Sequence, residues 1–241
     1  AASLPVALTP SCAAMRHIHF MLDGQGPAQF SPPNLSDYPV IQCTPPLKAR
    51  RIRLNELTKE DVAQWQMGDT LLLSGKLLTA RDAAHKRLVE LIQSGKSLPN
   101  GLSLSQRVLY YVGPIAPIKG EAVGPAGPTT AIRMDPFTPL LLEKGGILAM
   151  IGKAERGPDV IEAIKRHQAA YLIAVGGAAY LIARSIQSAR VTAFEELGME
   201  AMYEFEVQDM PVTVAIDSRG RSLHREGPMQ WRRIAFPSHK T

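Results

Sequence analysis

Cysteine and long apolar runs are the two features that this sequence has least of. Only Cys12 and Cys43 are cysteines among 241 residues, too few for a disulfide framework, which favours a reducing cytoplasm over secretion. No apolar run approaches the roughly 18–20 residues that a helix needs to span a bilayer, and no signal peptide is visible. We therefore expect a cytoplasmic globular protein with no membrane partner.

The positive net charge is not accompanied by a nucleic-acid signature. The formal net charge is +5, but the basic residues are spread along the chain, apart from residues 48–53 and Arg232-Arg233. Zinc-ligand spacing and an interleaved aromatic–basic pattern are both absent from the sequence. We expect no nucleic-acid partner, and we expect the excess cations to meet an acidic partner or to surround anionic ligands.

Two regions of different composition divide the chain. Residues 1–48 are rich in proline and lack regular periodicity, so we expect an extension that belongs to a linker or to a missing N-terminal domain. Strands and helices alternate over residues 49–241, which predicts an α/β fold with a β-rich C-terminal part. A short helix is expected after Thr58, a typical N-cap residue. Other helices are expected at 80–94, 129–144, 158–164 and 176–186, and strands at 69–74, 108–112, 147–151, 171–175, 191–194, 202–207 and 212–216.

Residues 127–135 (GPTTAIRMD) have the pattern of a loop that ends where a helix begins. A helix start offers free backbone N–H groups and a partial positive charge, which suit an anion. Arg133 lies four residues after Thr129, so a helix would place both side chains on one face. The segment therefore predicts a seat for a carboxylate or a phosphate.

Two more cations stand at positions where ligands commonly bind. Arg81 is at the start of a predicted helix, and Lys153 follows a buried strand, at the carboxyl edge where open α/β sheets place ligands. The alternative of a nucleotide loop is rejected, because Glu90 stands where the first glycine of such a loop belongs before Lys96-Ser97. A dicarboxylate is the preferred ligand, since two carboxylates need two cationic clamps and arginine binds them in bidentate geometry.

Several blocks of sequence, in order along nearly the whole chain, carry a family resemblance. They are residues 1–7, 11–12, 81–85, 127–135, 152–153, 176–179 and 196–201. With these blocks the chain resembles the C-terminal part of class I fumarate hydratases, which are iron–sulfur enzymes, and the related β subunit of L-tartrate dehydratase.

This resemblance implies a swivelling β/β/α domain and the reversible addition of water across the double bond of fumarate or a close analogue. Family members use a [4Fe–4S] cluster held by three cysteines, whose open iron acts as a Lewis acid. Cys12 matches the third of those cysteines. Thr129 matches a threonine that moves a proton at the substrate carbon, and Arg81, Arg133 and Lys153 match binders of the substrate carboxylates.

The chain also departs from the family pattern. Ile132 stands where the family often has glycine, and the other two cluster cysteines and an upstream catalytic histidine are missing. We therefore expect the isolated chain to have no cluster and little or no hydratase activity. The complete protein would need a cluster-bearing N-terminal domain or α subunit and would form a homodimer. L-tartrate dehydratase, mesaconate hydratase and a non-catalytic module that binds an anion or a partner are the alternatives.

Overall fold

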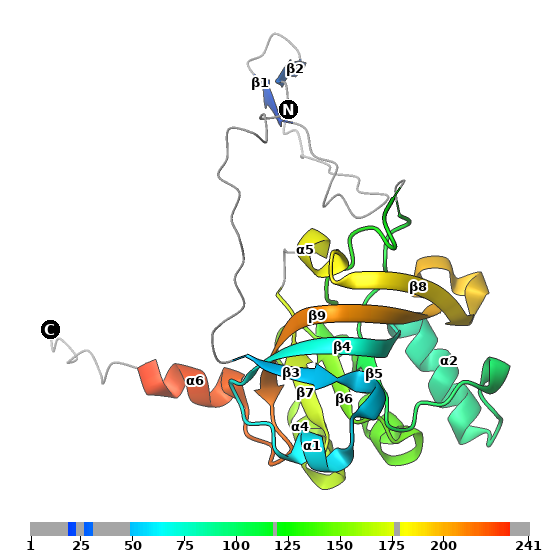
Figure 1. Cartoon of the computed structure of the whole chain (residues 1–241), viewed down its shortest axis with the longest axis vertical. Coiled ribbons are helices and arrows are strands. Elements are labelled where there is room, and N and C mark those ends of the chain that lie inside the picture. The colour runs from blue at the N-terminus through cyan, green and yellow to red at the C-terminus, as the bar shows by residue number, and fades with distance from the viewer. Residues whose placement is uncertain (1–18, 23–26, 31–48, 118–119, 176–178, 232–241) are drawn as a thin grey trace, which may run out of the picture. The chain divides into compact units, whose positions relative to one another are not determined.

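The computed structural model describes residues 19–22, 27–30, 49–117, 120–175 and 179–231 (Figure 1). The chain divides into two compact units, Ala1–Pro46 and Leu47–Thr241, whereas the sequence-based division is between residues 48 and 49. In the first unit, β1 (His19–Leu22) and β2 (Pro27–Phe30) pair as antiparallel strands.

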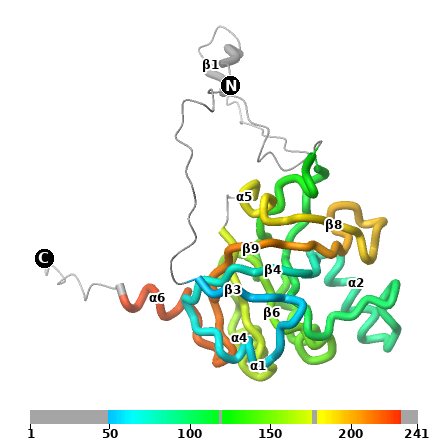
Figure 2. Tube along the Cα trace, in the orientation of Figure 1, coloured from blue at the N-terminus to red at the C-terminus, as the bar shows by residue number. Residues whose placement is uncertain are grey.

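The second unit is built on a seven-stranded sheet in the order β3-β4-β5-β6-β7-β9-β8. Neighbouring strands from β3 to β7 are parallel, and β9 runs antiparallel to β4, β7 and β8, as Figures 1 and 2 show for its path beside β4. Because β9 pairs with both β4 and β7, strands β4, β5, β6, β7 and β9 close into a ring. The strands are β3 (Arg50–Arg53), β4 (Thr70–Thr79), β5 (Val108–Tyr110), β6 (Ala149–Gly152), β7 (Ala170–Ile173), β8 (Ile186–Ala193) and β9 (Met202–Ile216).

The parallel strands β5, β6 and β7 bury both of their faces, which explains why their sequences are almost continuously apolar. Ile151 and Leu172 belong to one buried cluster, whereas Met150 and Tyr171, their neighbours in the chain, belong to a second cluster. This alternation follows from the pleat, which points successive side chains to opposite faces. The predicted α/β class is confirmed.

Helices α2 (Asp82–Gln93) and α4 (Pro158–His167) contribute their buried apolar residues to the second cluster. α4 begins at Pro158 as predicted, because proline is pre-organised for the first helical position. Thr58 caps α1 (Lys59–Ala63), also as predicted, and the structure shows that the cap is a reciprocal capping box with Asp61. The remaining helical segments are η2 (Leu54–Glu56), η3 (Pro99–Gly101), η4 (Ala131–Met134), α3 (Thr138–Leu140), η5 (Leu141–Gly145), α5 (Ala179–Ala183), η6 (Glu195–Glu200) and α6 (Leu223–Trp231).

The single helix predicted over residues 129–144 is wrong. The segment instead forms a 3-10 turn, η4, then three α-helical residues, α3, and a π turn, η5. Two causes are evident: Thr130, whose ψ is 117°, is held in a parallel β-bridge with Lys153, and Pro136 and Pro139 disfavour a continuous helix. The helix N-terminus predicted at Thr129 is therefore absent.

Two further predictions near the C-terminus need correction. The strands predicted at 202–207 and 212–216 are one strand, β9, because it continues through Asp209, whose φ is +49° and whose N–H donates to Ser74 Oγ at 3.0 Å. The β-rich reading of this part also missed α6. The predicted turn at residues 217–220 is present, with Gly220 N–H donating to Asp217 O at 2.9 Å.

The chain packs so closely against Gly152 that this position has no room for a side chain. An added Cβ would lie 3.0 Å from Ala131 Cβ, 3.0 Å from Tyr111 Cδ2 and 3.3 Å from Thr129 O. Overpacking at such a site costs about 1–3 kcal/mol. We expect Gly152→Ala to lower the free energy of unfolding by that amount in urea titrations.

Gly227→Ala is the matched control, because Gly227 lies in α6 and an added Cβ meets only Leu223 Cδ1, at 3.8 Å. Because Pro228 follows and disfavours the helical conformation for a residue with a Cβ, the usual gain from alanine in a helix interior is offset, and Gly227→Ala should change the free energy of unfolding by less than about 1 kcal/mol. Equal effects of the two substitutions would contradict the close approach at Gly152.

Candidate functional site

Three parallel strands end at the same edge of the sheet, and predicted site residues follow two of them. Arg81 comes two residues after β4, and Lys153 directly follows β6. Strand β5 lies between β4 and β6 and is parallel to both. The carboxyl ends of the three strands therefore lie together, in the arrangement that α/β proteins use for ligands.

The segment that carries Thr129 is inserted between the ends of β5 and β6. Thr129 N–H donates to Tyr111 O at 2.7 Å, Lys153 N–H donates to Thr129 O at 3.1 Å, and Ala131 N–H donates to Lys153 O at 3.0 Å. Thr130 and Lys153 form a parallel β-bridge. Strand-type hydrogen bonds, and not a helix start, thus bring Thr129 beside Lys153.

The two arginines of the predicted site share one carboxylate. Arg133 donates two hydrogen bonds to Asp82, one from Nε to Oδ1 at 3.0 Å and one from Nη2 to Oδ2. Arg81 Nε lies 3.9 Å from Asp82 Oδ2, and Arg81 Nη2 lies 3.1 Å from Glu200 Oε1. Glu200 also accepts a hydrogen bond from Ala83 N–H at 3.0 Å, at the start of α2.

The carboxyl edge keeps an excess of positive charge. Arg81 and Arg133 lie against the two carboxylates Asp82 and Glu200, and Lys153 is a third cation at this edge. Lys153 is exposed, and in the described part of the chain it has no carboxylate within ion-pair distance. The side chain of Arg133 is 48% exposed and that of Arg81 22%. A ligand carboxylate arriving from solvent can therefore reach Lys153 and Arg133.

Beneath this edge lies a buried charged side chain that sequence reasoning missed. Arg156 Nε donates to Asp135 Oδ1 at 2.6 Å, its Nη2 donates to Thr138 Oγ1 at 2.6 Å, and its Nη1 donates to Tyr111 Oη at 3.3 Å. Its guanidinium also lies 5.0 Å from the ring centroid of Tyr171, close enough for a cation–π interaction. Burial alone would lower the pKa of Arg156, but Tyr111 and Asp135 reverse the direction and raise it.

A weak signal for this network was present in the sequence. Asp135 ends the motif at residues 127–135, and Arg156 follows Lys153 by three residues. Sequence alone does not distinguish a buried arginine from a solvated one, and burial depends on how the turn after β6 meets α3.

His85 is the second buried polar side chain below the edge. It is 0% exposed, and its Nδ1–H donates to Arg81 O at 2.8 Å. Its ring packs edge-on to Tyr111 with 5.2 Å between the centroids. Burial lowers the pKa of His85 to about 4; the bond to Arg81 O opposes this shift, and Arg156 adds to it.

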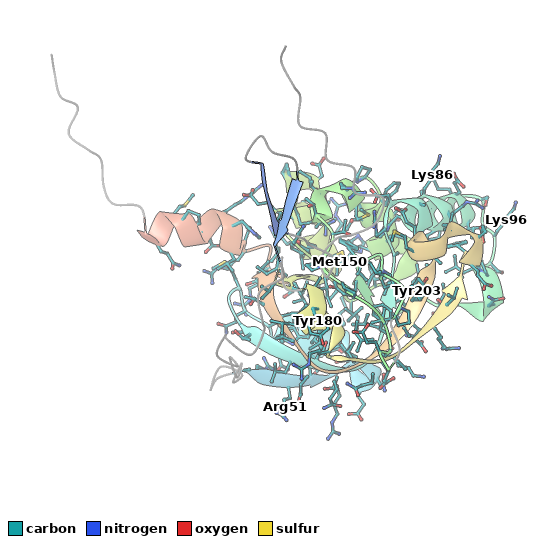
Figure 3. The ribbon with its side chains drawn as sticks, turned by 90° about the horizontal axis from the view of Figure 1, so that it is seen from above. Arg51, Lys86, Lys96, Met150, Tyr180 and Tyr203 are labelled. Atoms are coloured by element: carbon teal, nitrogen blue, oxygen red, sulfur yellow. The ribbon has the colours of Figure 1, made fainter. Side chains whose placement is uncertain are left out.

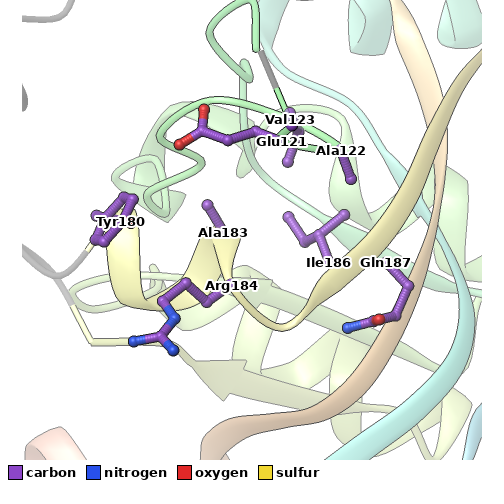
Figure 4. A pocket seen from close by; sticks show the side chains of 9 residues that line it. Glu121, Ala122, Val123, Tyr180, Ala183, Arg184, Ile186 and Gln187 are labelled. Carbon is purple, nitrogen blue, oxygen red and sulfur yellow. The ribbon is translucent and has the colours of Figure 1, made fainter. Parts of the chain in front are cut away.

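A cavity of about 300 Å³ lies apart from these cations (Figure 4). Its walls come from the loop before Pro125 and from the region of α5 and the start of β8, and Ala183 and Ile186 point into it in Figure 4. The four predicted residues Arg81, Thr129, Arg133 and Lys153 do not line it. The cavity is therefore not the predicted anion seat.

The described residues do not fit an iron–sulfur cluster. Such a cluster is held by cysteine thiolates, and the chain has only Cys12 and Cys43, both outside the described residues together with residues 176–178. Across the described ranges, no group of three or more His, Cys, Asp or Glu side chains is placed to hold a metal ion. None of the described helices has the length and apolar character to cross a membrane.

A model of the family described as Fumarase C-terminus matches residues 24–227. The chain belongs to this family. It is 36% identical over 234 residues to Fumarate hydratase 2 of Leishmania major, covering 92% of this chain and 40% of the relative. It is 34% identical over 238 residues to the anaerobic class I fumarate hydratase of Escherichia coli K12, covering 93% of this chain and 42% of the relative. The chain thus spans about two fifths of the length of these relatives.

A third relative is close to this family domain in length. The chain is 36% identical over 177 residues to a Methanocaldococcus jannaschii protein named "Putative L(+)-tartrate dehydratase subunit beta". The match covers 71% of this chain and 90% of that relative. A domain of this family thus occurs both inside longer chains and as a chain of its own.

The lowered pKa of His85 should make the stability of the protein depend on pH. Its pKa is about 4 in the folded protein and about 6.5 in an unfolded chain. Between these values only the unfolded state binds the proton, so stability is fully present above about pH 6.5 and is lost as the pH falls toward 4. This difference corresponds to about 3 kcal/mol.

We expect His85→Gln to flatten the dependence of the unfolding free energy on pH between about 6.5 and 4, measured by urea titrations at several pH values. His167→Gln, at a partly exposed histidine in α4, is the matched control variant. An unchanged slope in His85→Gln would show that His85 is not held neutral by burial.

Proposed function

We propose that this chain supplies the carboxylate-binding half of the active site of a hydro-lyase that adds water reversibly to fumarate. The observation that carries the proposal is the convergence of Arg81, Thr129, Arg133 and Lys153 at one edge of the sheet. Because the chain belongs to the Fumarase C-terminus family, we interpret these four residues as the part of the site that binds and hydrates fumarate. The fold unit corresponds in this proposal to the swivelling β/β/α domain of such enzymes, with residues 1–48 as its extension.

Arg133 and Lys153 are suited to hold the carboxylates of a dicarboxylate. Arg133 already binds Asp82 in the bidentate geometry that a substrate carboxylate would use, so exchange of Asp82 for substrate retains both hydrogen bonds. Lys153 offers a point charge from the neighbouring strand end. Removing a proton next to a carboxylate builds negative charge on that carboxylate, and fixed cations stabilise the charge.

Thr129 is the proposed proton-transfer residue. Its main chain is bonded on both sides, to Tyr111 and to Lys153, which fixes its position relative to the cations. A threonine hydroxyl is a weak base at neutral pH and needs a cationic setting, which Lys153 and Arg81 supply in this proposal. Its hydroxyl would take or return the proton on the substrate carbon.

The remaining half of the site would come from a cluster-bearing N-terminal domain or α subunit, since two cysteines are too few to hold a [4Fe–4S] cluster. We propose a homodimer of the complete protein in the cytoplasm. L-tartrate dehydratase is the second candidate, on the basis of the β-subunit relative.

The third prediction concerns the substrate. The complete protein, reconstituted anaerobically with iron and sulfide, is assayed on fumarate, L-tartrate and mesaconate. We expect the highest kcat/KM on fumarate; preference for L-tartrate would favour the second candidate. Absence of turnover on all three substrates with an intact cluster would falsify the enzyme proposal and favour a non-catalytic anion-binding module.

The fourth prediction concerns the cations. In the complete protein, Arg133→Ala and Lys153→Ala should each lower kcat/KM by about 10²–10³-fold, because each removes a charge that stabilises the transition state. Lys86→Ala is the matched control, since Lys86 is an exposed cation of α2 that projects outward in Figure 3. Wild-type kcat/KM in both site variants would contradict the assigned roles.

A further inference from the structure

Arg156 connects the segments that carry the proposed ligand-binding residues. Its side chain is 0% exposed, and its three hydrogen-bonded side-chain partners are Asp135, Thr138 and Tyr111. These partners come from two different stretches of the chain, and Arg156 itself lies in the turn between β6 and α4. The guanidinium thus joins three stretches below the carboxyl edge.

Two of these stretches carry residues proposed to act on the ligand, and the third, at Tyr111, is hydrogen-bonded to Thr129. Asp135 is two residues after Arg133, and Arg156 is three residues after Lys153. Tyr111 accepts the hydrogen bond from Thr129 N–H with its carbonyl oxygen. A shift of the guanidinium would therefore be transmitted to each of these three residues through only a few bonds.

The stretch around Arg133 needs such an anchor, because its own helical structure is short and irregular. It consists of a four-residue 3-10 turn, three α-helical residues and a five-residue π turn. Short segments of these types have poorer hydrogen-bond geometry than a regular α-helix. The direction of this stretch is therefore set by side-chain contacts, and Asp135 makes two, to Arg156 Nε and to Gly157 N–H, each at 2.6 Å.

Stability alone does not account for a charge at this position. Burying a guanidinium and a carboxylate carries a large desolvation penalty, and apolar side chains of similar volume often hold a fold equally well. The planar fork of arginine, by contrast, fixes the direction of several partners at once. We propose that Arg156 is a positioning residue, which holds Arg133, through Asp135, at the orientation and distance from Lys153 that a dicarboxylate requires. This inference rests on the proposed function of Arg133 and Lys153.

The test is a double-mutant cycle between Arg156→Met and Arg133→Ala in the complete, cluster-loaded protein. It is read out as kcat/KM for fumarate and as the Kd of succinate, a dicarboxylate without the reactive double bond. If Arg156 acts through Arg133, Arg156→Met alone should weaken both by about 10–100-fold. In the Arg133→Ala background the same substitution should change them by less than about threefold, because residues that act as a unit are not additive.

Arg107→Met is the matched control, since Arg107 donates to Glu204 at 2.7 Å just before β5, at the opposite end of that strand. It should combine additively with Arg133→Ala. Arg156→Lys keeps the charge but loses the fork, and it should fall between wild type and Arg156→Met on both readouts. This variant also serves if Arg156→Met fails to fold.

The possible outcomes distinguish the positioning role of Arg156 from the proposed function of the site. Additive effects of Arg156→Met and Arg133→Ala on both readouts, with fumarate turned over by the wild type, overturn the positioning role and leave the proposed function standing. Non-additive effects on succinate affinity in a wild type that turns over no substrate support the positioning role and overturn the proposed function. A wild type that neither binds succinate nor turns over fumarate overturns both.

Discussion

Main-chain hydrogen bonds hold residues 129–131 between the carboxyl ends of β5 and β6, and the geometry of the whole edge depends on them. Thr129 is bonded to Tyr111 and Lys153, and Ala131 is bonded to Lys153. Gly152 makes the close approach possible, because any side chain there would meet the inserted segment. The insertion occupies the N–H groups that a helix start would have offered to an anion, so the anion-binding capacity of this edge lies in side chains.

Those side chains form two layers with different roles. The outer layer, Arg81, Arg133 and Lys153, is partly or fully exposed, and its two arginines are held by Asp82 and Glu200. The inner layer is buried, and Arg156 is its central charge. An exposed cation by itself is mobile, since long side chains lose rotamer entropy when they are fixed. We infer that the buried layer around Arg156 fixes the backbone from which the outer cations project.

The sequence was informative about elements whose signals are local. The N-cap at Thr58, the start of α4 at Pro158 and the buried parallel strands follow from capping chemistry, proline geometry and apolar runs. The role of the four site residues stays a prediction, although the structure places Arg81, Thr129, Arg133 and Lys153 at one edge of the sheet. The predicted helix at 129–144 failed because Thr130 is held in a β-bridge with Lys153, which is distant in sequence, and because Pro136 and Pro139 interrupt the segment. Arg156 was missed because its burial depends on the same long-range packing.

The central claim is that Arg133 and Lys153 bind the carboxylates of a ligand. A crystal structure of the complete, cluster-loaded protein with succinate tests it most directly. We expect succinate carboxylate oxygens within hydrogen-bond distance of the Arg133 guanidinium and of Lys153 Nζ, with Asp82 displaced from at least one of its bonds to Arg133. Succinate bound elsewhere in the protein, with Asp82 still bidentate on Arg133 and Lys153 facing only solvent, would contradict it.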